Sequence, residues 1–174
     1  MVLIVCLAVL SARATAETVD FYPGKSTANG NPTPSAAGTP DESPYIAPFV
    51  PTPQEVVDRM LELAALKKDD VLYDLGSGDG RIVLTAARKY GIRAVGFEIS
   101  PDLVKTSRQH IAEAGLEHLA EIRQEDIRNV DLSPATVVTL YLYPGANLRL
   151  RPAIVRQLRP GSRVVSLQFT MGSW

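Results

Sequence analysis

Residues 71–87 read VLYDLGSGDGRIVLTAA, in which three glycines and two aspartates lie between two apolar runs. The run Val71–Leu75 predicts a short buried strand, and residues 80–90 predict a helix that ends at Gly91. Glycines between them allow positive backbone φ angles and let a ligand approach the main chain, because no Cβ blocks the way. We therefore expect a ligand at this strand-to-helix turn rather than a purely structural reversal.

The spacing of the glycines separates the ligand classes that use such turns. A phosphate-binding loop requires Gly-Lys-Ser/Thr after four intervening residues, which this turn lacks. A dinucleotide site has Gly-x-Gly-x-x-Gly, and Arg81 stands at the position of its third glycine. The pattern disfavours pyrophosphate and leaves a nicotinamide-dependent oxidoreductase as a weaker alternative.

The remaining folded part alternates strands with helices. Strands are expected at 93–100, 120–126, 135–144 and 161–169, and helices at 101–114 and 146–158, with a kink or restart at Pro152. Such alternation implies crossover connections and a doubly wound, mostly parallel, Rossmann-like α/β sheet with five strands visible in this sequence. In an open sheet of this kind, ligands bind beyond the carboxyl ends of the strands.

A first helix is predicted to precede the glycine turn. Thr52 is the expected N-cap, Pro53 the first helical residue, and Glu55 the partner that closes a capping box. The expected apolar stripe of this helix consists of Val56, Met60, Leu63, Ala64 and Leu66.

Acidic residues follow three successive predicted strands. Asp74 ends the first, Glu98 the second, and Glu125-Asp126 the third. Glu98 lies where doubly wound folds place an acceptor for both ribose hydroxyls, Asp126 suits an adenine amino group, and Asp74 suits a cationic amine. Each acid alone is equally well a solvated carboxylate, but together they favour a nucleoside joined to an amino acid, which describes S-adenosylmethionine.

The composition of the chain restricts the classes of partner and metal site that we expect. A chain of 174 residues with 45% hydrophobic content fits one core, and its formal net charge of -1 gives no basic field for nucleic acid. Cys6 is the only cysteine, and the two histidines, His110 and His118, lie eight apart, so we expect no metal site.

The amino-terminal region predicts three parts of the chain. Residues 1–16 read as a signal peptide or short hydrophobic anchor, with a core strand as the alternative. Residues 17–44 are rich in Pro, Gly and Ser and predict a disordered linker, and the domain is expected at 45–174. We expect export or membrane association, although a cofactor made in the cytoplasm keeps a cytoplasmic location open.

Several segments resemble a known family. The segments YDLGSGDGR, VGFEIS and QEDI resemble three motifs of class I S-adenosylmethionine-dependent methyltransferases. PFVPTPQEVVDRML, ATVVTLYLYPGANLRLRP and LRPGSRVVSLQFTMGSW resemble the small protein-lysine methyltransferases related to those acting on the ATP synthase c-subunit and the adenine nucleotide translocase. The resemblance covers residues 49–174 and implies a protein lysine as acceptor, in a membrane protein for some relatives. It implies cofactor contacts from Thr52, Asp74, Gly76, Ser77, Gly78, Gly80, Glu98, Ile99 and Asp126.

The resemblance also implies an acceptor channel. Its expected residues are Tyr141, Tyr143, Pro144 and Asn147, with Pro51 and Thr52 from the amino-terminal side, although both tyrosines fit simple core packing as well. Methyl transfer to a neutral amine relies on alignment, which agrees with the lack of a catalytic triad.

Departures from the family pattern support an alternative function. Ser173 stands where the family has an acidic residue, and Leu167-Gln168 stands where it has a polar pair with histidine. The family's antiparallel sixth and seventh strands are also not visible in this sequence. These departures keep open a non-catalytic or degenerate domain that binds S-adenosylmethionine or adenosine.

Overall fold

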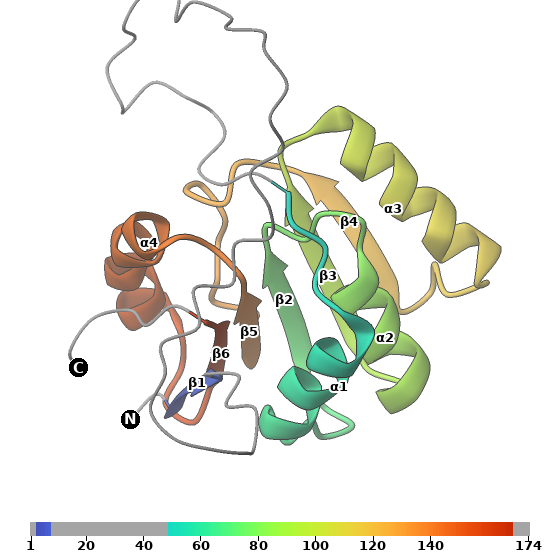
Figure 1. The fold of residues 1–174 in the computed structure, drawn as a ribbon. Helices are drawn as coiled ribbons and strands as arrows, with labels where there is room; N and C mark the ends of the chain where they lie inside the picture. The colour runs from blue at the N-terminus through green and yellow to red at the C-terminus, as the bar shows by residue number, and fades with distance from the viewer. Residues whose placement is uncertain (1–2, 8–48, 169–174) are drawn as a thin grey trace, which may run out of the picture. The chain divides into compact units, whose positions relative to one another are not determined.

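The sheet contains six strands in the order β1-β6-β5-β2-β3-β4, and every neighbouring pair is parallel (Figure 1). The computed structural model describes residues 3–7, by their backbone only, and residues 49–168. The strands are β1 (Leu3–Leu7), β2 (Val71–Leu75), β3 (Arg93–Glu98), β4 (Ala120–Gln124), β5 (Val137–Leu140) and β6 (Arg163–Leu167). Their parallel pairing confirms the predicted α/β class and places the carboxyl ends of the strands along one edge.

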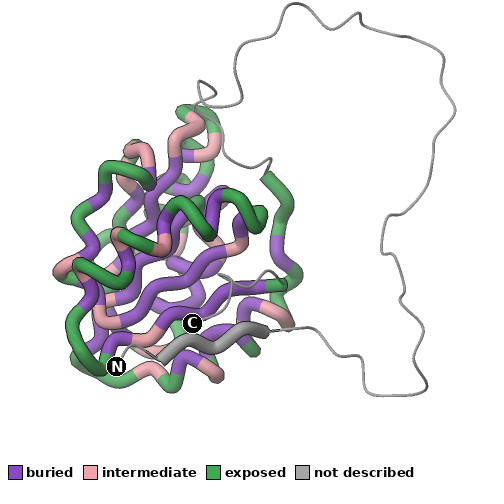
Figure 2. Tube along the Cα trace, turned by 90° about the vertical axis from the view of Figure 1, so that its left-hand side faces the viewer, coloured by how far each residue is buried: buried purple, intermediate pink, exposed green. Residues whose placement is uncertain are grey.

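Helices cover both faces of the sheet. They are α1 (Gln54–Leu63), α2 (Arg81–Tyr90), α3 (Pro101–Glu113) and α4 (Pro144–Gln157). The first three pack on one face and α4 packs on the other (Figure 1). Alternate strand residues therefore enter two apolar clusters, so that Leu72 joins the first and Tyr73 the second. Strands β2, β3, β5 and β6 are buried along almost their whole length between these layers, whereas β4 alternates between buried and exposed residues (Figure 2).

The predicted strand, turn and helix at 71–90 are confirmed. Gly80 and Gly91, which flank α2, both adopt the left-handed conformation, with φ of 79° and 64°. The helix expected from residue 146 begins earlier, at Pro144, and runs through Pro152 to Gln157. The strand expected to reach residue 144 ends at Leu140, so that the residues after it form a connection to α4.

The predicted capping box of α1 is wrong. The N-cap is Pro53, no side chain caps the helix, and the carbonyl of Pro53 accepts from the N–H groups of Val56 and Val57 at 3.0 Å. The buried stripe is Val57, Met60, Leu61 and Ala64, whereas Val56, Leu63 and Leu66 are only half-buried. The face of α1 that packs on the core is therefore rotated from the predicted one and includes Val57 and Leu61, because each residue advances about 100° around the helix axis.

The segment predicted as a signal peptide contributes an additional strand. Leu3–Leu7 pairs in parallel with β6, from Leu3 opposite Arg163 to Leu7 opposite Leu167. A run of apolar, partly β-branched residues satisfies the backbone groups of β6 in this way, which agrees with the core-strand alternative. The structure does not support the signal peptide, and export stays a prediction. Residues 8–48, including all of the predicted linker at 17–44, lie outside the described part of the chain.

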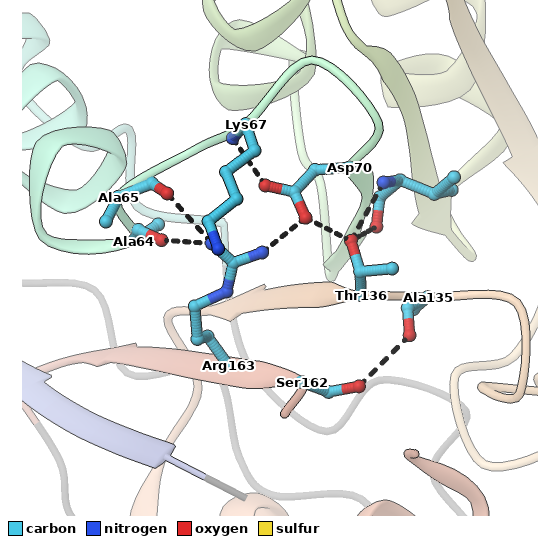
Figure 3. Close-up of polar contacts among 9 residues, drawn as sticks. Ala64, Ala65, Lys67, Asp70, Ala135, Thr136, Ser162 and Arg163 are labelled. Carbon is cyan, nitrogen blue, oxygen red and sulfur yellow. Dashed lines mark hydrogen bonds and ion pairs between the residues drawn. The ribbon is translucent and has the colours of Figure 1, made fainter. Parts of the chain in front are cut away.

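At the amino-terminal ends of the strands, a buried ion pair joins the loop before β2 to β6. Arg163 donates to the Asp70 carboxylate and to the carbonyls of Ala64 and Ala65, at 3.0 and 2.8 Å for the carbonyls (Figure 3). Asp70 also accepts from the Thr136 hydroxyl at 2.7 Å and from the Lys67 N–H at 2.6 Å. Although burial acts to raise the pKa of Asp70, these hydrogen bonds and Arg163 hold it below its usual value. This network fixes β2, β5 and β6 at the edge opposite the carboxyl ends.

Within residues 3–7 and 49–168, none of the helices has the length and apolar character needed to cross a membrane.

Candidate functional site

A cavity of about 540 Å³ lies at the carboxyl ends of the strands. Its walls come from the ends of β2, β3, β4 and β5 and from the segment before α1. Among its lining residues are nine that the sequence predicts: Thr52, Asp74, Gly76, Ser77, Gly78, Glu98, Ile99, Asp126 and Tyr141. The cavity therefore lies where the sequence predicts the ligand site, beyond the carboxyl ends of a doubly wound sheet.

The glycine turn shapes the floor of this cavity. Gly76, Gly78 and Gly80 have φ of 79°, 54° and 79°, which residues with a Cβ adopt at a steric cost. The N–H groups of Gly76 and Ser77 both donate to the Phe97 carbonyl, at 2.9 and 3.0 Å, and so fasten the turn to β3. Gly80 does not line the cavity; a Cβ there would lie 2.9 Å from the Cβ of Ser107 on α3. Its role is helix packing behind the cavity wall.

Ser77 depends on a glycine that the sequence analysis did not single out. A Cβ added at Gly96 would lie 2.6 Å from the Ser77 hydroxyl oxygen and 2.6 Å from Cδ1 of Ile122. The hydroxyl is buried and has no hydrogen-bond partner among the described residues. A glycine inside a predicted strand is a known sign of close approach, and this signal could have identified Gly96.

Glu98 lies in the cavity wall, buried, with both carboxylate oxygens already accepting backbone hydrogen bonds. Oε2 accepts from Gly78, and Oε1 accepts from Ile99 and Ser100, each at 2.9 Å. A carboxylate has about four acceptor positions, so roughly one remains for a ligand. Glu98 thus links β3 to the glycine turn, and a ribose that uses both hydroxyls has to displace one backbone donor.

Asp74 is buried at the end of β2 and lines the same cavity as Glu98. Thr139, opposite it on β5, donates to Oδ1 at 2.7 Å. The pKa of Asp74 is raised to about 7, with burial as the main cause; the neighbouring charges of Glu98 and Asp79 contribute to the rise, and the hydrogen bond from Thr139 acts against it. A buried carboxyl of this kind gains most from a cationic partner.

Asp126 lines the cavity beyond the end of β4. Its carboxylate accepts from the backbone N–H of Arg128 at 2.9 Å and from Nε of the same arginine at 2.9 and 3.0 Å. These hydrogen bonds lower its pKa. The structure therefore places Asp126 where the sequence predicts it, with a cationic partner that the prediction did not include.

Of the predicted acceptor residues, the cavity lining includes Thr52 and Tyr141, and the Tyr141 hydroxyl donates to Oε1 of Gln168 at 3.0 Å. Pro51 is exposed and lies outside the lining. Tyr143 and Pro144 lie exposed at the start of α4, outside the lining. Asn147 is fully buried, and its amide donates to the Ser166 hydroxyl at 3.3 Å. Asn147 lies on the buried face of α4, with Ala146 and Leu150, and outside the cavity lining, so the prediction that it lines the channel is not supported.

The sequence analysis did not single out Phe49, in the segment before α1, or Arg81, at the start of α2, as cavity residues. Phe49 lines the cavity, and a Cβ added at Gly78 would lie 2.4 Å from its ring. Arg81 also lines the cavity and donates to the Thr52 carbonyl at 2.6 Å. In the sequence, Arg81 stands at the position of the third glycine of a dinucleotide motif, and no local pattern connects it to Thr52.

Comparison with known proteins decides the family. Residues 74–174, more than half of the chain, match the family described as the ANTKMT methyltransferase domain. The chain belongs to this family. It is an S-adenosylmethionine-dependent methyltransferase of the protein-lysine methyltransferase group, as the sequence resemblance implied, and the comparisons contain no support for a non-catalytic domain.

The methyltransferase has similar proteins in archaea, animals and bacteria. It is 44% identical to a protein-lysine N-methyltransferase of Saccharolobus islandicus, over 73% of this chain and 80% of the relative. It is 32% identical to the lysine N-methyltransferase of the ATP synthase c-subunit from Homo sapiens, over 80% of this chain and 60% of the relative. A crystal structure described as an RNA methyltransferase from Salinibacter ruber, in complex with S-adenosyl-L-homocysteine, is 61% identical, with a TM-score of 0.71 over 72% of this chain and 82% of that one.

Proposed function

We propose that this methyltransferase transfers the methyl group of S-adenosylmethionine to a lysine side chain of a protein, in the cavity at the carboxyl ends of the strands. The observation that carries the proposal is the meeting of Asp74 and Glu98 in one cavity beside the glycine turn. The lysine acceptor is supported by the names of the archaeal and human relatives.

The cavity residues fit this cofactor. Asp74, a buried carboxyl that accepts one hydrogen bond from the described residues, suits the amino group of the methionine part. Glu98 offers its remaining acceptor position to a ribose hydroxyl, and Asp126 borders the place for the adenine. Two carboxyls so near the glycine turn repel a phosphate, which agrees with a nucleoside that carries none. When bound, S-adenosylmethionine supplies a methyl group on a positively charged sulfur.

The chain's own contribution to the reaction is alignment and exclusion of water. The acceptor amine must be neutral so that its lone pair attacks the methyl carbon as the carbon–sulfur bond breaks; the new ammonium then releases its proton to solvent. Tyr141 lies at the cavity wall with its hydroxyl held by Gln168, a position from which it can orient the amine. Aligning two reactants in this way lowers barriers by roughly 7–11 kcal/mol in favourable systems.

The acceptor is proposed to belong to a membrane protein, because the human relative is named for the c-subunit of the ATP synthase. The chain spans 60% of the length of that relative. For this reason its particular acceptor is part of the proposal rather than a consequence of family membership.

RNA is the second candidate acceptor, favoured by the description of the Salinibacter ruber protein. The charge distribution gives it some support, since residues 132–174 contain five arginines and no acidic residue. Against it stands the net charge of -1, because RNA binding relies on a field of basic residues.

One labelling experiment separates the two acceptors. The purified protein is incubated with S-adenosylmethionine labelled in its methyl group and with membrane, soluble and RNA fractions of the source cells. We expect label in the membrane fraction that is sensitive to protease and resistant to ribonuclease, and mass spectrometry should place it on lysine. Label that only ribonuclease removes would establish RNA instead, and no label in any fraction would count against both.

A further inference from the structure

The chain before α1 forms one side of the cavity. We call residues 49–53 the strap; they contain Phe49, Val50 and Thr52, which line the cavity, and two prolines. Phe49 and Val50 are about half exposed, at 46% and 53%, whereas Thr52 is 5% exposed. The strap therefore has one buried attachment point, at Thr52, and an apolar part that remains accessible from the cavity.

Arg81 makes that attachment. Its Nη1 donates to the Thr52 carbonyl at 2.6 Å, while Nε and Nη2 donate to the Asp79 carboxylate at 2.9 and 2.5 Å. The guanidinium is planar and rigid, so fixing its fork on Asp79 also fixes the direction of Nη1. Because Arg81 is the first residue of α2, the strap is fastened to the glycine turn and not to a mobile surface group.

The apolar part of the strap meets the same turn. The ring of Phe49 covers Gly78 so closely that no Cβ could stand between them. The N–H of Gly78 in turn donates to Glu98 at 2.9 Å. A continuous set of contacts thus runs from Phe49 through Gly78 to the carboxylate proposed to hold the ribose.

We propose that Arg81 is a positioning residue for the cofactor: it holds the strap against the glycine turn so that Phe49 and Thr52 close the side of the cavity that the sheet leaves open. The proposal rests on the proposed function, since it takes this cavity as the cofactor site. Arg81 acts through the strap, because its donors are directed to Asp79 and Thr52. A strap held in place before binding reduces the ordering that the cofactor must bring about.

The test combines calorimetry with hydrogen exchange on the full chain. S-adenosylhomocysteine is titrated into the parent protein, Arg81→Met, Arg81→Lys and a matched control, Arg88→Met, which alters an exposed arginine on the same helix. Strap exchange is followed at the amides of Val56 and Val57, which donate to the carbonyl of Pro53 in the strap, and at β2 and β3 as a check on folding. We expect Arg81→Met to bind ten- to hundredfold more weakly, Arg81→Lys to lie between it and the parent, and Arg88→Met to bind like the parent. Strap exchange should accelerate in Arg81→Met alone, with the strands unchanged.

A double substitution provides a second readout. Phe49→Ala should also weaken binding, and combining it with Arg81→Met should add little to the larger single loss, because both act through the strap. Fully additive losses would contradict the proposal, as would weaker binding with unchanged strap exchange, which would mean direct contact between Arg81 and the ligand. Faster strap exchange with unchanged binding would overturn it too. If the parent protein fails to bind S-adenosylhomocysteine, the proposed function fails first, and the exchange data still show whether Arg81 holds the strap.

Discussion

Asp74 and Thr139 stand opposite each other on β2 and β5, and the threonine hydroxyl donates to the aspartate carboxyl at 2.7 Å. This hydrogen bond is the only one found for the Asp74 side chain within the described residues, and it does not offset the cost of burial. The pKa of Asp74 is therefore raised to about 7, with burial as the main cause and Glu98 and Asp79 as further contributions. The carboxyl is half protonated near neutral pH.

Cofactor binding should consequently release protons near neutral pH. A cationic amino group favours the carboxylate form of Asp74, so the affinity for S-adenosylhomocysteine should rise as the pH increases from 6 to 8. Calorimetry in two buffers of different ionisation enthalpy measures the released protons directly. Asp74→Asn should bind roughly tenfold or more weakly and lose the proton release, since a charge-assisted contact disappears. Equal binding enthalpies in both buffers for the parent protein would speak against this role.

The same pKa makes a separate prediction for stability. Between the ordinary value of 3.8 and the folded value of about 7, the folded state binds more protons than the unfolded state. Stability contributed by this site therefore falls as the pH rises through that window and stays low above it. Asp74→Asn removes the penalty and should raise the free energy of unfolding at pH 8 by up to about 4 kcal/mol, with a smaller gain at pH 5. Urea unfolding at the two pH values tests it; a loss of stability at pH 8 would contradict the assigned cause.

Much of this site could be predicted from residues that act locally. The glycines at 76, 78 and 80 require positive φ, and Asp74 and Glu98 occupy strand ends, so a single sequence reveals them. Contacts between distant segments could not be read in the same way. Arg81 reaches Thr52 across 29 positions, and Asn147 is buried because the sheet packs against its face of α4, which is also a tertiary contact. The pairing of β1 with β6 likewise depends on tertiary contacts, whereas composition alone suggested a leader segment.

Gly96 should tolerate no side chain. In Gly96→Ala the new Cβ would press on the Ser77 side chain and on Ile122, at 2.6–2.7 Å, so one of the neighbours has to move. We expect a loss of about 1–3 kcal/mol in stability, typical of overpacking, together with weaker cofactor binding because Ser77 is displaced. Gly145→Ala is the matched control: its Cβ would meet nothing within 4 Å in α4, so stability should be unchanged or slightly higher. Thermal unfolding of both variants measures the difference. A Gly96→Ala variant as stable as the parent protein would contradict the close packing of Gly96 against Ser77 and Ile122.

Arg163 should matter for folding and not for the cofactor. Its partner Asp70 is 6% exposed, so Arg163→Met leaves a buried carboxylate without its cation (Figure 3). Breaking such a pair costs about 3–5 kcal/mol, whereas Arg159→Met, on the exposed surface, should cost little. Because this network lies at the opposite edge from the cavity, affinity for S-adenosylhomocysteine should be retained under conditions where the variant is folded. A large loss of affinity without a loss of stability would be the contrary result.

The central claim, that the cavity at the carboxyl ends of the strands is the cofactor site, is tested most directly by titrating S-adenosylhomocysteine into the parent protein, Glu98→Gln and Glu125→Gln. Glu98 accepts three backbone N–H groups in the cavity wall, and its amide variant loses both charge and acceptor positions there. Glu125 is half-buried and does not line the cavity, so it provides a control of equal charge change. The account predicts one binding site in the parent protein, at least roughly tenfold weaker binding in Glu98→Gln, and parent-like binding in Glu125→Gln. No binding by the parent protein, or equal binding by all three, would contradict it.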